Sequence, residues 1–499
     1  MNGPMDRLLL RNARCFRAGR REACDLLILG DRYEQVAPAG RLTPPPGTPV
    51  QDLQFQGLVI AGFLDVHAHP AHWGLSLSRL RLDDARSLED ALDRVRAALD
   101  TLQGDALIAE GFDESRWSPP QRPTRRHLDR ISRTVPIVLR RICGHVAVAN
   151  AAALARIPAR TRGVNRRTGL LLEEPSLNLD RYFPPSLEEL KLGILMAQSR
   201  LLKMGITGVH EFGKAQKFRA YQELARSGAL QLRVTFYFYE PHLDTLEALG
   251  IQSSLGDERI RIGGLKVFLD GSVGAGTAGF PHFPRARVYP LERLKRLLHR
   301  ANEAGLQVAM HAIGPLAIDR ALQALRATQV GGNVHRHRIE HFVFPTEDHL
   351  RWTARLGIGV TLQPNFLRQW GHPGGLYHQR VGDEAFRQAF PLRSILDAGI
   401  RVAFSSDGMP FGPLFGLKGA LSHPRPEDRI SLEVALDLYI RQGAWFSFEE
   451  HLKGDLQPGM LADPVLLLPD PFEVDDLDRV EAFPLRVNPE PPDPLRAVF

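Results

Sequence analysis

Four histidines and one aspartate stand where they could bind a metal ion. Two of them, His67 and His69, form a His-x-His pair at the end of an apolar run. Alternate side chains of an extended strand point the same way, so both imidazoles can reach one ion. The others, His311, His341 and Asp407, each end or directly follow a further apolar run. The sequence predicts a metal site wherever the ends of these runs meet.

Lys266 is unusual because it interrupts an apolar run in a chain with only eight lysines. A buried lysine pays a large desolvation penalty, which lowers its pKa toward neutrality. An uncharged amine can add carbon dioxide to form a carbamate, an anionic ligand that can bridge two metal ions. The alternative interpretation is a lysine paired with Asp270 or Glu240.

The elements that would position these residues are eight short apolar runs, each followed by an amphipathic stretch. This pattern is typical of parallel strands joined by helical crossovers. Eight such units favour an α/β fold, a (β/α)8 TIM-like barrel, whose active sites lie at the carboxyl ends of the strands. The runs cover residues 58–66, 206–212, 234–239, 265–269, 307–312, 338–342, 358–362 and 402–405.

Short apolar segments punctuated by glycine and proline at both chain ends predict small antiparallel strands. We therefore expect a small β-sandwich domain built from residues 1–58 and 447–499, and a hydrolase barrel over residues 59–446. Roughly 140 residues separate the first two barrel runs, so part of this stretch must be an insertion. We assign residues 105–185 to an inserted subdomain over the active face, where specificity is usually decided.

Composition excludes several classes of protein. The 499 residues are 43% hydrophobic and 24% charged, which is typical of a globular chain rather than a disordered or fibrous one. The net charge of +6 is small, and no basic run is interleaved with aromatics, so we expect no nucleic-acid partner. No apolar stretch reaches the roughly 18 residues of a membrane helix. Three unclustered cysteines, Cys15, Cys24 and Cys143, argue against a disulfide framework and suggest a reducing, cytoplasmic compartment.

Several motifs together carry a resemblance to a known family. The chain resembles the amidohydrolase superfamily and, within it, the YtcJ-like branch of amidohydrolase family 3, which includes N-substituted formamide deformylase-like enzymes. The motifs are Gly-Phe-Leu-Asp-Val-His-Ala-His at 62–69, Gly-Ile-Thr-Gly-Val-His-Glu at 205–211, the segment 266–272, His-Arg-Ile-Glu-His at 337–341 and Leu-Gln-Pro-Gly-Met-Leu-Ala-Asp at 456–463.

The resemblance implies a distorted barrel with a metal centre at its mouth. Carried over by position, His67, His69 and Asp407 would bind one ion and His311 and His341 the other. A carboxylated Lys266 would bridge them. Zinc is the commonest ion of the family, with one or two ions per chain.

The implied reaction is hydrolysis of a non-peptide C–N bond, such as that of an N-acyl or N-formyl amine. A divalent ion lowers the pKa of a water that it binds toward roughly 7, which supplies hydroxide for attack. Asp407, beside that water, would act as general base and then pass the proton to the leaving nitrogen. Lys266 and Asp407 are therefore the predicted catalytic residues.

Other residues are candidates for contact with a small-molecule amide substrate, although core packing is the stronger interpretation of each aromatic. They are Trp73, Phe112, Trp117, His145, His210, Phe212 and Asp270. Two alternatives on the same scaffold are a deaminase and a cyclic amidase, and a third is a metal-free scaffold protein. Lys266 argues against a deaminase, because a mononuclear site needs no bridging carbamate. The sequence leaves open whether the protein forms a homo-oligomer.

Overall fold

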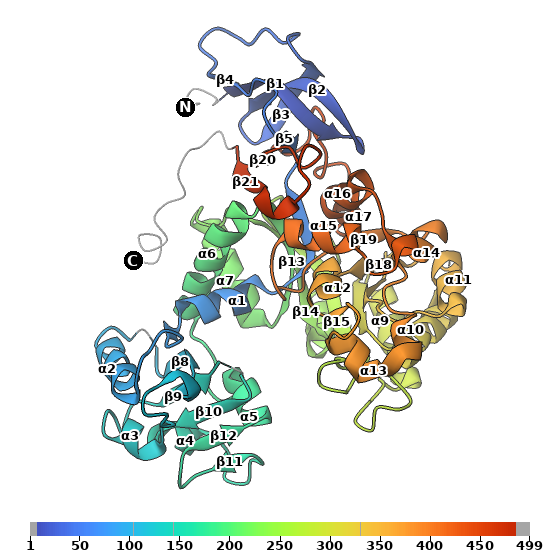
Figure 1. Ribbon diagram of the computed structural model, residues 1–499. Coiled ribbons are helices and arrows are strands. Elements are labelled where there is room, and N and C mark those ends of the chain that lie inside the picture. Colours follow the sequence, from blue (N-terminus) through green and yellow to red (C-terminus); the bar gives the residue numbers. More distant parts are fainter. Residues whose placement is uncertain (1–6, 103, 143, 330, 486–499) are drawn as a thin grey trace. The chain divides into compact units, whose positions relative to one another are not determined.

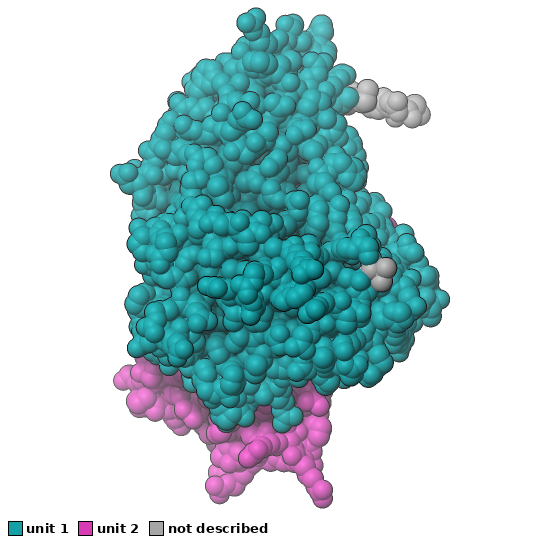
Figure 2. Space-filling view, turned by 90° about the vertical axis from the view of Figure 1, so that its right-hand side faces the viewer, with its two compact units in different colours: residues 1–69, 198–218, 228–491 teal, residues 70–197, 219–227, 492–499 magenta. Residues whose placement is uncertain are grey.

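The computed structural model describes residues 7–102, 104–142, 144–329 and 331–485, so Cys143 lies outside the described residues. The chain divides into two compact units, which Figure 2 shows in different colours. Unit 1 comprises residues 1–69, 198–218 and 228–491, and unit 2 comprises residues 70–197, 219–227 and 492–499.

Unit 1 contains the predicted barrel, an eight-stranded parallel sheet with the order β19-β18-β17-β16-β15-β14-β13-β6 (Figure 1). The amide of Asp407, just after β19, donates a 2.7 Å hydrogen bond to the carbonyl of His67 on β6, which brings the first and last strands together. The (β/α)8 prediction is confirmed. The strands are β6 (Phe63–Ala68), β13 (Ile206–Gly213), β14 (Arg233–Tyr239), β15 (Ile260–Phe268), β16 (Gln307–Ala312), β17 (Arg338–His341), β18 (Gly359–Leu362) and β19 (Val402–Phe404).

Amphipathic helices follow the barrel strands because their apolar residues recur on one face. Leu294, Leu297, Leu298 and Ala301 form such a face on α9 and are all buried. Figure 1 shows α9, α10 and α11 outside the strands. The helices that follow the barrel strands are α7 (Ala215–Arg226), of which residues 219–226 belong to unit 2, α8 (Leu243–Ala248), α9 (Leu291–Glu303), α10 (Pro315–Thr328), α11 (Glu347–Arg355), α12 (Pro364–Trp370), α13 (Leu376–Phe386), α14 (Leu392–Asp397), α15 (Pro413–Leu421), α16 (Leu432–Ile440) and α17 (Gln442–Phe446).

The first predicted run, 58–66, is divided between two sheets. It ends one strand at Ile60, turns at Gly62 and begins β6 at Phe63. Gly62 has a φ of +84°, and a Cβ on it would lie 2.3 Å from the Thr207 hydroxyl oxygen, so this turn requires glycine.

Both chain ends contribute to a second sheet of unit 1, with the order β21-β20-β5-β1-β2-β3 and β4 paired with β1. In Figure 1 the red strand β20 lies beside the blue strand β5, and the two pair antiparallel. The strands are β1 (Arg7–Arg17), β2 (Arg20–Leu29), β3 (Arg32–Pro38), β4 (Val50–Asp52), β5 (Leu58–Ile60), β20 (Val465–Leu468) and β21 (Glu481–Pro484).

This sheet holds a disulfide between Cys15 and Cys24, so the prediction that argued against a disulfide framework is wrong for this pair. The two residues lie on β1 and β2, which pair antiparallel with a register shift between Leu10 and Ala13. The pairing brings their Cα atoms to 6.3 Å, within the range that a disulfide spans. Linear spacing could not reveal this approach. The cytoplasmic location stays a prediction.

Unit 2 follows the first barrel strand directly and has its own sheet, with the order β11-β12-β10-β9-β8-β7. Its helix α2 begins after Ser87, whose hydroxyl accepts the amide of Asp90. The elements are α1 (Pro70–Ser78), β7 (Leu80–Arg81), α2 (Leu88–Leu99), β8 (Leu107–Phe112), α3 (Arg125–Asp129), β9 (Ile137–Arg141), β10 (Val146–Ala149), α4 (Ala151–Arg156), β11 (Val164–Asn165), β12 (Leu170–Leu172), α5 (Glu174–Leu177) and α6 (Leu187–Lys203), whose last residues belong to unit 1. Among the described residues, no helix is both long enough and apolar enough to cross a membrane.

Candidate metal centre

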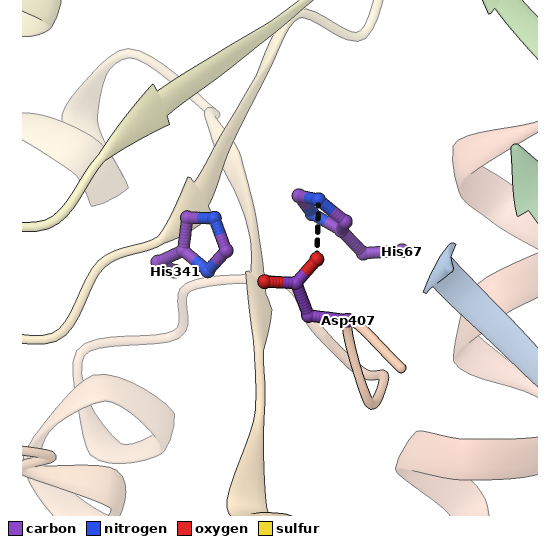
Figure 3. Close-up of side chains that lie close together, drawn as sticks. All are labelled: His67, His341 and Asp407. Carbon is purple, nitrogen blue, oxygen red and sulfur yellow. Dashed lines mark ion pairs between the residues drawn. The ribbon is translucent and has the colours of Figure 1, made fainter. Parts of the chain in front are cut away.

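Three predicted ligands meet at the carboxyl end of the barrel. One ligand atom each of His67, His341 and Asp407 lies within 4.8 Å of the others. Figure 3 shows the Asp407 carboxylate between the two rings, with its Oδ1 3.4 Å from Nε2 of His67. His341 and Asp407 both have left-handed backbones, with φ of 74° and 58°. Such backbones are strained in residues other than glycine and are common at functional sites.

His69 and His311 border this cluster. Nε2 of His69 lies 3.0 Å from Oδ1 of Asp407, and its Nδ1 lies 3.8 Å from Glu211. The ring of His311 lies 4.4 Å from that of His341, measured between centroids. Nε2 of His311 donates to the Gly271 carbonyl at 3.1 Å, which leaves Nδ1 as its lone-pair nitrogen.

Two of the predicted ligand rings each donate a hydrogen bond from Nδ1 to a neighbouring acceptor. Nδ1 of His67 donates to Oε2 of Glu340 at 2.5 Å, and Nδ1 of His341 donates to Oε1 of Gln363 at 2.7 Å. These bonds fix the tautomers, so both Nε2 atoms carry the lone pairs that a metal ion needs. Sequence reasoning missed both supporting residues.

Glu340 is itself held inside the barrel. Arg338, two residues earlier on β17, places its Nε 2.6 Å from Oε1 of Glu340, and the Thr361 hydroxyl donates to Oε2 at 2.5 Å. Arg338 also contacts Nδ1 of His210 at 2.9 Å. The spacing of Arg338 and Glu340 in His-Arg-Ile-Glu-His was the available signal, because alternate residues of a strand share one side.

Lys266 is buried beside the cluster, with 1% of its surface exposed. Its Nζ lies 3.3 Å from Nε2 of His67 and 4.4 Å from the centroid of the Phe212 ring. Burial lowers the pKa of Lys266 to about 8, although the charges of Glu340 and Asp407 partly oppose this shift. At pH 7 about one amine in ten is therefore uncharged, far more than for an exposed lysine.

The alternative partners predicted for Lys266 are engaged elsewhere. The Asp270 carboxylate accepts the backbone amides of Gly279, Ile313 and Gly314. Glu240 accepts hydrogen bonds from Tyr289 and Arg293. Within the described parts of the chain, Lys266 forms no ion pair shorter than 4.0 Å.

The protonation states fit a cation site. Burial lowers the pKa of His311 to about 4 and that of His341 to about 3, so both rings are neutral near pH 7. Burial alone would raise the pKa of Asp407, but the neighbouring His67 and His69 outweigh it and hold that pKa well below its usual range. The pKa of His67 is also lowered, first by burial, whereas at His69 burial is outweighed by the carboxylates of Asp407 and Glu211, which raise the pKa. Neutral rings of His67, His311 and His341 beside a charged carboxylate form a donor set suited to zinc and similar divalent ions.

The predicted substrate-contact residues are distributed over both units. In unit 1, the centroid of the Phe212 ring lies 4.5 Å from that of His67. His210 instead contacts the Arg338 guanidinium through Nδ1, and the Asp270 carboxylate accepts backbone amides. These three residues support the cluster from the barrel interior and from the loop after β15.

The other four candidates belong to unit 2. Phe112 and Trp117 are buried in its core, and the Trp117 indole donates to the carbonyl of Ala85, which favours the packing interpretation. His145 is exposed and pairs with Glu173 at 2.8 Å. Trp73 lies on α1.

Comparisons with known proteins agree with this geometry. A sequence profile described as the amidohydrolase family matches residues 50–484. The putative amidohydrolase YtcJ of Bacillus subtilis (strain 168) is 28% identical over 476 residues, which cover 87% of this chain and 89% of that protein. The N-substituted formamide deformylase of Arthrobacter pascens is 23% identical over 519 residues, covering 93% and 94%. The crystal structure of an uncharacterized metal-dependent hydrolase from Pyrococcus furiosus superposes with a TM-score of 0.83 at 28% identity, covering 94% of this chain and 100% of that one.

Proposed function

The chain belongs to the amidohydrolase family, in the YtcJ-like branch of family 3, and from this premise we propose that it hydrolyses an exocyclic amide such as an N-acyl or N-formyl amine. Its family and its likeness to a solved metal-dependent hydrolase support a metal-dependent hydrolase. A relative named for deformylation of N-substituted formamides supports the choice of bond.

The observation that carries the proposal is the buried cluster of His67, His341 and Asp407 with Lys266 beside it. We assign His67, His69 and Asp407 to one ion and His311 and His341 to a second. Lys266 would bridge the two as a carbamate. When bound, a divalent ion such as zinc polarises a carbonyl and acidifies water.

The chain's own groups then move the proton. Water loses a proton to the Asp407 carboxylate as its oxygen forms a bond to the carbonyl carbon. The protonated Asp407 returns that proton to the amide nitrogen as the C–N bond breaks, so a carboxylic acid and an amine leave. Asp407 is suited to this role because its carboxylate is charged and faces both His67 and His69.

The test combines metal content with product analysis. Protein prepared with zinc and bicarbonate should contain two ions per chain by plasma mass spectrometry, and Lys266→Ala should contain one or none. Lys295→Ala is the matched control, because Lys295 pairs with Glu292 on α9. N-formyl and N-acetyl amines should yield free amine. Release of ammonia from aminated heterocycles, with no turnover of amides, would overturn the proposal in favour of deamination.

A further inference from the structure

Phe268 is an exposed aromatic residue at the end of the strand that carries Lys266. It is 51% exposed, although its neighbour Val267 is buried. Residues two apart on a strand share one side, so Phe268 and Lys266 project in the same direction. Nζ of Lys266 lies 5.3 Å from the centroid of the Phe268 ring. The ring therefore borders the candidate metal site on the side of Lys266.

Neighbouring strands hold this ring on two sides. The ring of His311 on β16 lies 5.4 Å away at 43°, and the ring of Tyr239 at the end of β14 lies 5.9 Å away at 54°, between centroids. Tilted aromatic pairs at these distances attract each other. These contacts hold the Phe268 ring in place beside the predicted ligand His311.

A second exposed apolar residue follows Asp407 in the loop after β19. Met409, two residues after Asp407, is 49% exposed. Three strands separate β19 from β15 in the barrel order. Exposed apolar residues thus stand near the ends of two strands that lead to the candidate site, and ligand sites commonly combine an apolar lining with a few polar groups.

Packing against Tyr239 and His311 covers only part of Phe268. Leu265, Lys266 and Val267 before it on β15 are all buried, whereas about half of Phe268 stays exposed and gives up the free energy that full burial would yield. A ligand that covers the exposed face recovers this free energy.

Resting on the hydrolase function proposed above, we infer that Phe268 determines the specificity of this site and that the substrate carries a flat, apolar group packed on the exposed face of its ring. In this substrate the flat group lies close enough to the amide carbonyl that the group can pack on Phe268 while the carbonyl lies at the candidate metal site. Tyr239 is a positioning residue. It packs against Phe268 from β14, whereas the predicted ligand His311 packs against Phe268 from β16 on the other side of β15.

The test measures binding without hydrolysis. Two ketones serve as probes, 4-phenyl-2-butanone and 2-pentanone, in which a methylene replaces the amide nitrogen of N-benzylacetamide and N-ethylacetamide. Their Kd values are measured by calorimetry on the zinc-loaded enzyme, on Phe268→Ala and on Phe268→Trp. Leu249→Ala is the matched control, because Leu249 is 67% exposed and follows α8.

We expect the wild type to bind the phenyl ketone at least about 10-fold more tightly, from the burial of one additional ring. Phe268→Ala should reduce this ratio to about 3-fold or less, while Phe268→Trp and Leu249→Ala retain it. An unchanged ratio in Phe268→Ala overturns the inference, as does a wild type without preference. If the preference is retained but neither amide is hydrolysed, the proposed function fails and the assignment of Phe268 stands.

Discussion

Nδ1 of His67 donates to Oε2 of Glu340 across 2.5 Å in the closed interior of the barrel, where both side chains are buried. This bond turns Nε2 of His67 toward Asp407. Glu340→Gln removes the negative charge that holds the ring and leaves Arg338 without its counter-charge. Loss of such a supporting partner typically weakens metal binding by about 10- to 100-fold. Competition with a zinc chelator measures the change.

Two comparisons separate positioning by Glu340 from simple damage to the fold. Thr361→Val removes only the hydroxyl that donates to Oε2 of Glu340, so it should weaken zinc binding less than Glu340→Gln. Glu450→Gln, at an exposed ion pair with Arg336, should leave zinc affinity unchanged. Equal zinc affinity in Glu340→Gln and wild type would contradict the positioning role.

Asp407→Asn should lower kcat for amide hydrolysis by about 10²- to 10⁴-fold, the usual contribution of a general acid and base. The amide oxygen of asparagine can still approach a cation, so much of the bound metal should remain. Steady-state kinetics and metal analysis on the same sample check both parts. Asp397→Asn, at the exposed last residue of α14, is the control. A near wild-type kcat in Asp407→Asn would remove this residue from the mechanism.

The location of the candidate site follows from the sequence because parallel strands bring their carboxyl ends to one mouth. His67, His311 and His341 stand at the ends of apolar runs, so strand assignment alone placed them near one another. Lys266 stood out for a similar reason, as a charged residue inside an apolar run. The roles assigned to these residues stay predictions.

Features that depend on pairing across the chain could not be predicted in this way. Glu340 reads as an ordinary charged residue until β17 places it behind His67. The disulfide depends on how β1 pairs with β2, and the division of 58–66 depends on contact between Gly62 and Thr207. The exposure of Phe268 likewise could not be predicted, because it depends on which side chains pack around the end of β15.

His337 should make the stability of the protein dependent on pH. Its Nδ1 accepts the amide of Val308 at 3.0 Å and its Nε2 donates to Asn302 at 2.7 Å, so only the neutral ring satisfies both partners. Burial lowers its pKa from 6.5 to about 3. Because the unfolded chain binds this proton first as pH falls, the stability from neutral His337 is complete above pH 6.5 and is lost between 6.5 and 3.

The measurement is the free energy of unfolding in urea between pH 6.5 and 4.5. His337→Asn should flatten its slope by about 1.4 kcal/mol per pH unit relative to the wild type. Other buried histidines contribute to both proteins, so the difference between them is the informative quantity. His299→Asn, at an exposed position on α9, should leave the slope unchanged. Parallel slopes for His337→Asn and wild type would show that His337 does not carry this dependence.

Lys266 offers a chemical test that its neighbours do not. If carbon dioxide adds to its amine, chelator-stripped protein should regain zinc faster and more completely when bicarbonate is present than in bicarbonate-free buffer. Lys266→Ala should show no response to bicarbonate, but a short carboxylate such as propionate should partly restore its metal content by occupying the vacated space. Lys295→Ala should respond as the wild type does. A bicarbonate response that persists in Lys266→Ala would place the effect elsewhere in the chain, and no response in the wild type would leave Lys266 as an unmodified amine packed against His67 and Phe212.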